Sequence, residues 1–369
     1  MSFDRSDSRS QNLQEIVNPL LAAFTHPSLR KNLLELGAIH HAVLVDHVLH
    51  IKLTLPFAWP QGFQALQAWA TRSLCEQTGA TSVDWHLNYE IATLQRVKNL
   101  PGCRGVKNII AVSSGKGGVG KSSTALNVAL ALADQGIKVG VLDADIYGPS
   151  LPQMLGTTDQ RPSSPDGKHM APILSYGLAT NSIGYLVTDD NAMIWRGPMA
   201  SKALLQLLNE TLWPDVDYLV VDMPPGTGDI QLTLAQNIPV TGAVVVTTPQ
   251  DVALLDARKG VVMFNKVNVP VLGIVENMSV HICENCGHHE AIFGEKGAQG
   301  LSDDYAIPVL GKVPLHRQLR QDLDAGIPTV VRDPAGPFSV LYREIAENIA
   351  SELYWQGEVI PEDIAVRLV

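Results

Sequence analysis

The sequence contains little positive charge, and this shortage excludes whole classes of partner. Its 369 residues include 27 lysines and arginines against 37 aspartates and glutamates, so the formal net charge is −10. Such a balance argues against broad electrostatic binding to nucleic acid or anionic lipid. The sequence also lacks an apolar run long enough to span a bilayer, and its polar start lacks the apolar core of a signal peptide. We therefore expect a cytoplasmic protein that binds neither nucleic acid nor membrane.

Cysteines are also scarce, with only Cys75, Cys103, Cys283 and Cys286. Thiols stay reduced in the cytoplasm, so we interpret these four as ligands or buried thiols rather than as disulfides. Hydrophobic residues make up 46% of the chain and charged residues 17%, which is typical of packed globular structure. Because a single core rarely grows to 369 residues, we expect two domains.

Composition and periodicity divide the chain into four parts. We expect a disordered tail over 1–12, a small α/β domain over 13–98, a turn-rich linker over 99–107 and a second domain over 108–369. The elements predicted for the first domain are a helix over 14–36, strands over 41–46 and 48–55, a helix over 63–76 and a strand over 81–87.

In the second domain, apolar runs alternate with helical patterns, and a helix is predicted over 338–354. The predicted strands are 109–112, 138–142, 218–221, 243–247, 271–275 and 309–313. Each is almost continuously apolar, as expected when helices cover both faces of a parallel sheet. The fold class is therefore α/β, a doubly wound, mostly parallel sheet with ligands at the carboxyl ends of its strands.

One segment of this domain carries a phosphate-binding motif. The predicted strand 109–112 leads into GKGGVGKS at 115–122, and an alanine-rich helical pattern follows. This is G-x-x-x-x-G-K-[ST] between a strand and a helix, as a P-loop requires. Backbone N–H groups would bind phosphate oxygens, Lys121 the β- and γ-phosphates, and the Ser122 hydroxyl Mg²⁺. The predicted nucleotide-binding residues are Gly115, Lys116, Gly117, Gly118, Val119, Gly120, Lys121, Ser122 and Ser123.

Carboxylates follow two of the predicted strands. We expect Asp145 to orient or deprotonate the attacking water and Asp143 to act nearby through the hydration shell of Mg²⁺. Asp222 directly follows the other of these strands, 218–221, and is the second carboxylate that a P-loop NTPase needs near its metal.

Three further features are predicted at the same edge of the sheet. The proline- and glycine-rich loop 223–229 is able to change course when the γ-phosphate is lost. The side-chain amide of Asn277 is suited to pair with the adenine edge, because it donates and accepts together. His316 follows a predicted strand and is expected to line the nucleotide site.

A second chemical motif is the C-x-x-C pair of Cys283 and Cys286. A redox dithiol would place its first cysteine at a helix N-terminus, whereas Gly287 favours a tight knuckle. A zinc knuckle needs four ligands and would recruit His288 or His289. An iron–sulfur cluster also takes four cysteines, and a two-fold dimer would supply them by doubling the pair. The chemistry of these residues leaves zinc and iron–sulfur open.

The extra lysine of the loop, Lys116, makes GKGGVGKS resemble the deviant P-loop of the MinD/ParA/nitrogenase-iron-protein group. In that group the lysine reaches across a dimer to the partner's nucleotide. The resemblance implies the same role for Lys116.

Further motifs make residues 108–369 similar to the Mrp/ApbC family of ATP-hydrolysing iron–sulfur cluster carriers. They are DADIYGPS at 143–150, WRGP at 195–198, DMPPGTGD at 222–229, ENMS at 276–279 and the pair Cys283 and Cys286. The resemblance implies ATP, Mg²⁺ and a homodimer that holds a labile, bridging [4Fe-4S] cluster on both cysteines of each chain. It also implies scaffold or donor proteins as the source and apo iron–sulfur proteins as recipients. The implied catalytic residues are Lys116, Lys121, Asp145 and Asp222.

Residues 13–98 resemble the small cluster-assembly domain often fused in front of such ATPases. This chain has HPS at 26–28 where that family shows Asp-Pro-Glu, and LPFAW at 55–59 where a cysteine follows Thr-Pro. We therefore expect the domain to dock partners rather than to bind the cluster. Cys75 is expected to be a core thiol, and Cys103 in the linker is a further candidate ligand.

Two other functions remain open from the sequence. The first alternative is a partitioning or positioning ATPase of the MinD/ParA kind. A membrane-bound version would need a basic amphipathic C-terminal helix, whereas residues 357–369 are not basic. Such an ATPase also has no evident use for Cys283 and Cys286. The second alternative is a zinc-stabilised dimeric ATPase that acts as a scaffold.

Overall fold

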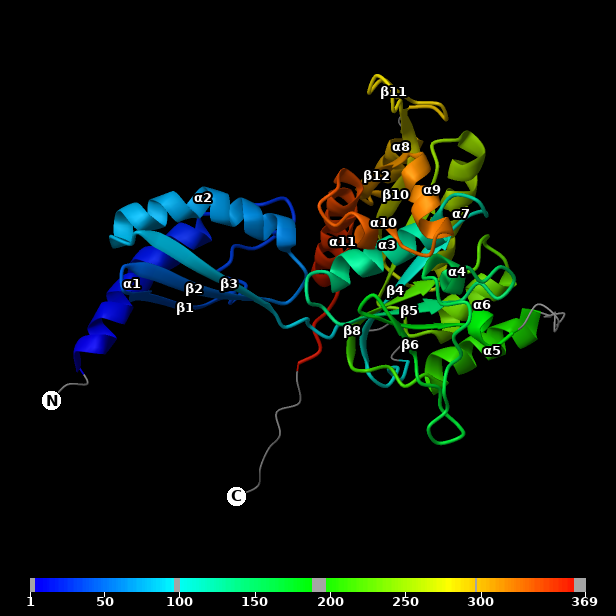
Figure 1. Ribbon diagram of the computed structural model, residues 1–369, viewed down its shortest axis with the longest axis horizontal. Helices are drawn as coiled ribbons and strands as arrows, with labels where there is room; N and C mark the ends of the chain where they lie inside the picture. Colours follow the sequence, from blue (N-terminus) through cyan, green and yellow to red (C-terminus); the bar gives the residue numbers. More distant parts are fainter. Residues whose placement is uncertain (1–3, 96–99, 188–196, 296, 362–369) are drawn as a thin grey trace. The chain divides into compact units, whose positions relative to one another are not determined.

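The computed structural model describes residues 4–95, 100–187, 197–295 and 297–361. The chain divides into two compact units, Met1–Ala92 and Thr93–Val369, each with its own sheet (Figure 1). The second unit begins before the expected boundary, because the Leu94 backbone N–H donates to the Asn108 side chain over 3.0 Å. Leu94 also forms a β-bridge with Val359. Of the expected linker, 99–107, the first residue lies outside the described residues and the last two already belong to a strand of the second sheet.

The first unit is a three-stranded sheet with two long helices. Its elements are α1 (Asp4–Ala22), β1 (Ile39–Val45), β2 (Val48–Leu55), α2 (Pro60–Thr78) and β3 (Ser82–Tyr89). The strands lie in the order β1-β2-β3, with β1 antiparallel and β3 parallel to β2. Leu49, Ile51, Leu53 and Leu55 alternate along β2 and are fully buried, so one face of the sheet forms the core.

Two expectations for this unit are wrong. Residues 4–12 form the start of α1 rather than a disordered tail, while residues 1–3 lie outside the described residues. The first helix ends at Ala22 and not at Leu36. Pro27 explains part of this difference, because the residue before a proline is pushed out of the helical conformation.

The second unit alternates strands and helices along the chain. Its elements are β4 (Val106–Ser114), α3 (Lys121–Ala133), β5 (Val139–Asp143), α4 (Leu151–Met154), β6 (Ile173–Ser175), β7 (Leu178–Ser182), a 3₁₀ turn (Ile183–Tyr185), α5 (Gly197–Glu210), β8 (Val216–Asp222), α6 (Asp229–Asn237), β9 (Gly242–Thr247), α7 (Asp251–Lys266), β10 (Val271–Ile282), β11 (His289–Glu290), α8 (Gly297–Tyr305), β12 (Val309–Leu315), α9 (Arg317–Asp324), α10 (Thr329–Arg332) and α11 (Pro337–Gln356).

These strands form one sheet in the order β11-β10-β9-β4-β8-β5-β7-β6, with β12 also paired to β10. The pairs in its centre are parallel, and among the described residues of this sheet only the β10–β11 and β6–β7 pairs are antiparallel. Helices α3 and α11 pack together against the sheet, while α7 and α8 contact β9 and β10 (Figure 1). All six strands predicted from apolar runs are present, which confirms the doubly wound α/β fold.

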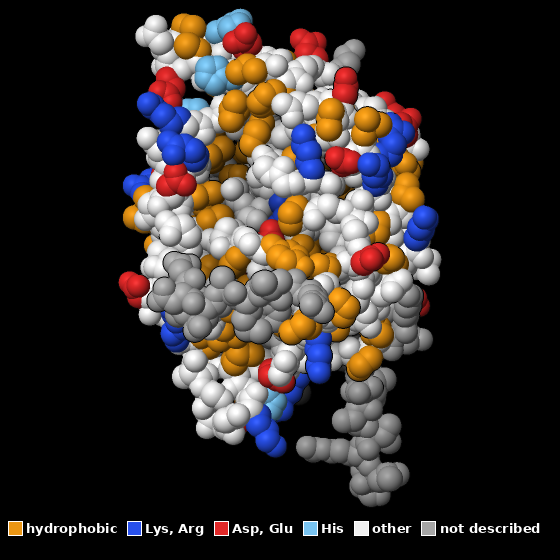
Figure 2. All heavy atoms as spheres, turned by 90° about the vertical axis from the view of Figure 1, so that its right-hand side faces the viewer, with side chains coloured by type: hydrophobic (Ala, Val, Ile, Leu, Met, Phe, Trp, Pro, Cys, Tyr) orange, Lys and Arg blue, Asp and Glu red, His pale blue; other side chains and the backbone are white. Residues whose placement is uncertain are grey.

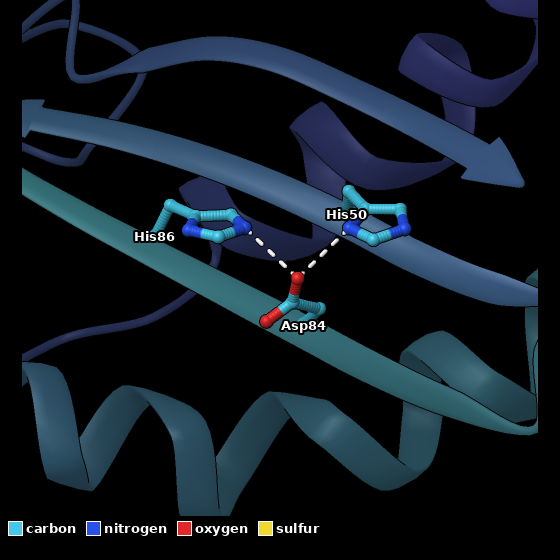
Figure 3. A group of neighbouring side chains, drawn as sticks. All are labelled: His50, Asp84 and His86. Carbon is cyan, nitrogen blue, oxygen red and sulfur yellow. Dashed lines mark hydrogen bonds and ion pairs between the residues drawn. The ribbon is translucent and has the colours of Figure 1, made fainter.

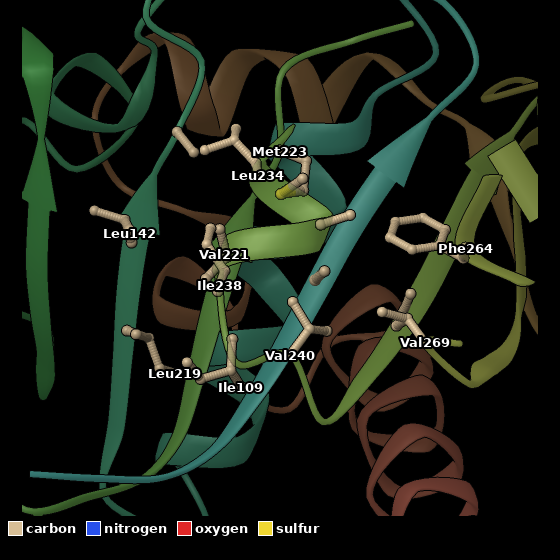
Figure 4. Packing of buried hydrophobic residues seen from close by; sticks show 14 of the residues in the cluster. Ile109, Leu142, Leu219, Val221, Met223, Leu234, Ile238, Val240, Phe264 and Val269 are labelled. Atoms are coloured by element: carbon tan, nitrogen blue, oxygen red, sulfur yellow. The ribbon is translucent and has the colours of Figure 1, made fainter. Parts of the chain in front are cut away.

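The core explains why those runs were continuous. Every residue of β5 and β9 is buried, because helices cover both faces. Figure 4 shows Ile109, Leu219 and Val221 packed with Leu234 of α6 and Phe264 of α7. Within the described ranges, no helix has both the length and the apolar character needed to cross a bilayer.

Candidate functional site

The phosphate-binding motif folds as the strand–loop–helix unit that the sequence predicted, with β4 before it and α3 after it. Gly120 has φ 82°, a left-handed conformation that favours glycine. A Cβ on Gly120 would also lie 2.0 Å from the Asn277 amide nitrogen, and one on Gly115 would lie 2.2 Å from the Asp256 backbone. The loop therefore needs glycine at both ends, for conformation and for close packing.

Lys121, the first residue of α3, is held by a buried ion pair. Its Nζ donates to the Asp222 carboxylate at the end of β8 and lies 3.1 Å from the Ser122 hydroxyl. Only 6% of the Lys121 side chain and 5% of the Asp222 side chain are exposed. The hydroxyl and carboxylate oxygens predicted to serve Mg²⁺ thus lie around one ammonium group.

Asp143 is completely buried at the end of β5. Its carboxylate accepts hydrogen bonds from the backbone N–H groups of Asp145, Ser150 and Leu151 and from the Ser182 hydroxyl, over 3.0–3.1 Å. Burial raises the pKa of Asp143 from 3.8 to about 7, and the neighbouring Asp222 charge acts in the same direction. Asp143 therefore organises the turn after β5.

Asp145 lies in this turn and is half-buried. Desolvation raises its pKa, while the Lys121 ammonium opposes the shift and the Asp222 carboxylate adds to it. These influences show that the structure brings Asp143, Asp145, Lys121 and Asp222 into one electrostatic group. Lys116 lies in the loop, half-buried, and its backbone carbonyl accepts from the Ser114 hydroxyl over 2.9 Å.

The loop after β8 is tied to the P-loop strand. The Gly226 N–H donates to the Ser114 carbonyl over 2.9 Å, and the buried Gln231 side chain donates to the Pro224 carbonyl. Gln231 also lies 3.4 Å from the Ser113 hydroxyl, while its Oε1 has no partner among the described residues. No sequence motif predicts a role for Gln231, because a glutamine near the start of a helix is common and carries no specific signal.

Asn277 of β10 holds the P-loop from its other side. Its amide nitrogen donates to the Val119 carbonyl over 2.8 Å, and only 8% of the residue is exposed. One of its donors is thus engaged with the loop, and its pairing with adenine stays a prediction.

A cavity of about 420 Å³ lies beside this contact. Gly120, Ser123, Ser150, Asn277 and His316 are among the residues that line it. The Ser150 hydroxyl is buried and has no hydrogen-bond partner among the described residues. An unpaired polar atom in the cavity wall suits a polar ligand, and the place of His316 at the nucleotide stays a prediction.

The C-x-x-C pair lies in a hairpin between β10 and β11. The Cys283 N–H donates to the His288 carbonyl and the Gly287 N–H to the Cys283 carbonyl, over 2.9 and 2.8 Å. Gly287 has φ 69°, so the predicted tight knuckle is present. Figure 2 shows histidine side chains gathered at the end of the molecule that carries this hairpin. The knuckle thus presents its side chains at the surface.

The two thiols of the knuckle are accessible, and the pKa of the first is lowered. Cys283 is half-buried and Cys286 is exposed, and neither forms a disulfide. Hydrogen bonds from the backbone of Asn285 and Cys286 lower the pKa of the Cys283 thiol. A lower pKa favours the thiolate, which is the form that binds metal.

The other two cysteines lie elsewhere. Cys103 is buried in the core and its thiol donates to the Leu208 carbonyl over 3.5 Å, so the structure does not support it as a ligand. Cys75 lies half-buried in α2. The motif residues Trp195 and Arg196 lie outside the described residues, while Gly197 and Pro198 start α5.

Comparison with known proteins is consistent with this geometry. A ParA family profile, described as NUBPL iron-transfer P-loop NTPase, matches residues 105–350. An iron–sulfur cluster carrier protein of Salmonella typhimurium is 67% identical over 367 residues, 99% of this chain and 100% of that protein. The iron–sulfur cluster transfer protein NUBPL of Mus musculus is 51% identical over 251 residues, 68% of this chain and 78% of that protein.

Among solved structures, a nucleotide-binding protein of Archaeoglobus fulgidus in complex with ADP is 37% identical, with a TM-score of 0.54. The match covers 60% of this chain and 87% of that one.

Proposed function

The chain belongs to the ParA family of NUBPL iron-transfer P-loop NTPases, and from this premise we propose that it carries an iron–sulfur cluster and hydrolyses ATP to control the transfer. Relatives named iron–sulfur cluster carrier protein match almost the whole chain, which supports the first part of the proposal. Scaffold proteins would donate the cluster in the cytoplasm, and apo iron–sulfur proteins would receive it.

The observation that carries the proposal is the accessible thiol pair on the β10–β11 hairpin. Cys283 and Cys286 supply two thiolates, whereas a [4Fe-4S] cluster takes four. A homodimer with these hairpins facing each other completes the set by two-fold symmetry. A cluster shared at the surface of two chains is accessible to a recipient, as transfer requires.

Strand β10 connects the cluster site to the nucleotide site. Asn277 contacts the P-loop, and Cys283 follows six positions later, directly after the end of β10 at Ile282, roughly 20 Å away at the rise of an extended chain. The Arg317 side chain, next to cavity-lining His316, pairs with Glu284 of the knuckle over 2.7 Å. A change in the P-loop on nucleotide binding therefore has a short physical path to the thiolates, which couples nucleotide state and cluster affinity.

The residues around Lys121 fit a Mg²⁺-bound nucleotide. Ser122 and Asp222 supply the oxygen donors that Mg²⁺ prefers. The Ser150 hydroxyl, in the lining of the adjacent cavity, has no hydrogen-bond partner among the described residues. Bound Mg²⁺ would neutralise phosphate charge. Lys121 would exchange its bond to Asp222 for the β- and γ-phosphates, and Asp145 would orient the attacking water.

Anaerobic reconstitution with iron and sulfide tests the cargo. We expect the parent chain to gain visible charge-transfer absorbance, and Cys283→Ala and Cys286→Ala each to lose it. Cys75→Ala, which removes a half-buried thiol of the first unit, is the matched control and should bind the cluster normally. Tightly bound stoichiometric zinc that iron cannot displace would instead identify the zinc-stabilised scaffold.

The dimer and the role of Lys116 need a separate test. Light scattering with ATP should detect a dimer whose ATPase activity falls at least about a hundredfold in Lys116→Ala, while ATP binding stays within a few fold. Loss of ATP binding in this variant would contradict a role across the dimer. If the chain is monomeric under every nucleotide condition, the proposal that two chains share one cluster is wrong.

A further inference from the structure

The first unit carries a group of metal-binding side chains on the sheet face opposite its core. Along β2 and β3 the side chains alternate between the two faces, and the register pairs His50 with Asp84 and Lys52 with His86. His50, Asp84 and His86 therefore lie on one face, opposite the buried Leu49 and Ile51 positions.

The three side chains converge on one point, as Figure 3 shows. The Asp84 carboxylate oxygen Oδ2 lies 2.9 Å from His50 Nδ1 and 2.9 Å from His86 Nε2. All three atoms lie within 4.8 Å of one another. The side chains are 41%, 46% and 57% exposed for His50, Asp84 and His86, so an ion can reach them from solvent.

We propose that His50, Asp84 and His86 bind one divalent transition-metal ion. Two imidazole nitrogens and one carboxylate oxygen form a donor set that suits zinc, iron(II), cobalt or nickel, with the remaining positions left to water. Mg²⁺ and Ca²⁺ prefer oxygen donors and are disfavoured here. Each ring would offer the nitrogen that now faces Asp84 and carry its proton on the other nitrogen.

The backbone makes this group more than a chance meeting of surface residues. Asp84 and His86 are two positions apart on β3, and the register of β2 fixes His50 opposite Asp84. The backbone therefore holds the three residues side by side before any ion binds. Lys52 lies opposite His86 in the register of β2 and β3, on the same face of the sheet. Its positive charge opposes cation binding nearby. Neutralising Lys52 should therefore strengthen the binding of the metal ion.

The experiment uses the full chain with Cys283→Ser and Cys286→Ser, so that no thiolate of the knuckle competes. Zn²⁺ is titrated against a chromophoric chelator, with Mg²⁺ in excess. We expect one zinc ion whose affinity falls at least about tenfold in His50→Gln, Asp84→Asn and His86→Gln. Lys52→Gln should raise the affinity. His41→Gln removes an exposed histidine of β1 outside the group and should leave it unchanged.

Two results would overturn the proposal. One is that the Cys283→Ser/Cys286→Ser chain binds no more zinc than its His50→Gln derivative; the other is an equal loss of zinc affinity in His50→Gln and His41→Gln. Co²⁺ provides an independent readout, because its visible spectrum reports nitrogen and oxygen ligands and should change in His86→Gln. Far-ultraviolet circular dichroism checks that the variants fold. Cluster reconstitution depends on Cys283 and Cys286 and not on these histidines. The two experiments therefore test the metal site and the cluster-carrier proposal separately, and either proposal can be wrong without the other.

Discussion

Removal of the Lys121 ammonium should lower the free energy of unfolding, because it leaves buried carboxylates of the nucleotide site without their cation. Lys121 and Asp222 form a buried ion pair, and the completely buried Asp143 carboxyl lies in the same electrostatic group. Breaking a buried pair by removing one partner costs about 3–5 kcal/mol. We therefore expect Lys121→Met to lower the free energy of unfolding of the nucleotide-free chain by that amount near neutral pH. A domain stability of about 5–15 kcal/mol makes this a severe change.

The same reasoning fixes how the loss depends on pH. Without Lys121, the folded-state pKa of Asp143 rises further, because the buried carboxyl loses the nearby ammonium that lowers its pKa and still faces the Asp222 charge. A carboxyl group with a raised folded-state pKa contributes stability that is present below its unfolded value, near 3.8, and is lost as pH rises through the folded value. The penalty of Lys121→Met should therefore be larger at pH 8 than at pH 5.5.

A double-mutant cycle in urea measures the effect. Lys121→Met/Asp222→Asn leaves no unpaired charge at this position and should recover about 2 kcal/mol or more relative to the sum of the single variants. Arg320→Met, which breaks an exposed pair with Asp324, is the matched control and should change stability by less than about 1 kcal/mol. Hydrogen exchange of β4 and β8 assigns the transition to the second unit. Additive single effects, or a penalty that does not depend on pH, would refute the buried-pair reasoning.

Three more predictions concern the same edge of the sheet. The raised pKa of Asp143, about 7, means that its contribution to stability is lost as pH rises through that value, so urea unfolding of Asp143→Asn should show a smaller decline between pH 5 and pH 8 than the parent. Asn277→Ala leaves the Val119 carbonyl without its donor, a cost of about 1–3 kcal/mol to the loop, so steady-state kinetics should show a KM for ATP about tenfold higher with kcat little changed; an unaltered KM would contradict this role. Gly120→Ala should weaken binding of a fluorescent ATP analogue, because alanine is strained at this left-handed φ and its Cβ would displace the Asn277 amide, 2.0 Å away, that holds the loop; normal binding would show that the loop can rearrange.

The local pattern of the sequence was sufficient for the scaffold of the site. Continuous apolar runs predicted the parallel strands because burial on both faces demands them, and GKGGVGKS predicted the loop because its conformation depends on glycine within a few residues. Cys283 and Cys286 were found for the same reason, since Gly287 makes a knuckle of neighbouring residues. Where the prediction depended on distant packing, it was less successful. The burial of Cys103 against Leu208 is one example, since its position between domains had suggested an exposed ligand.

The sequence by itself determined which chemical groups this protein has and the strand, loop or helix on which each lies, because those depend on neighbours along the chain. Only the tertiary structure decided which groups meet. Lys121 pairs with Asp222 across 101 positions, Asn277 bonds to Val119 across 158, and His50 meets Asp84 across 34. Such meetings depend on strand order and register, which are set by the packing of the whole core rather than by any one segment.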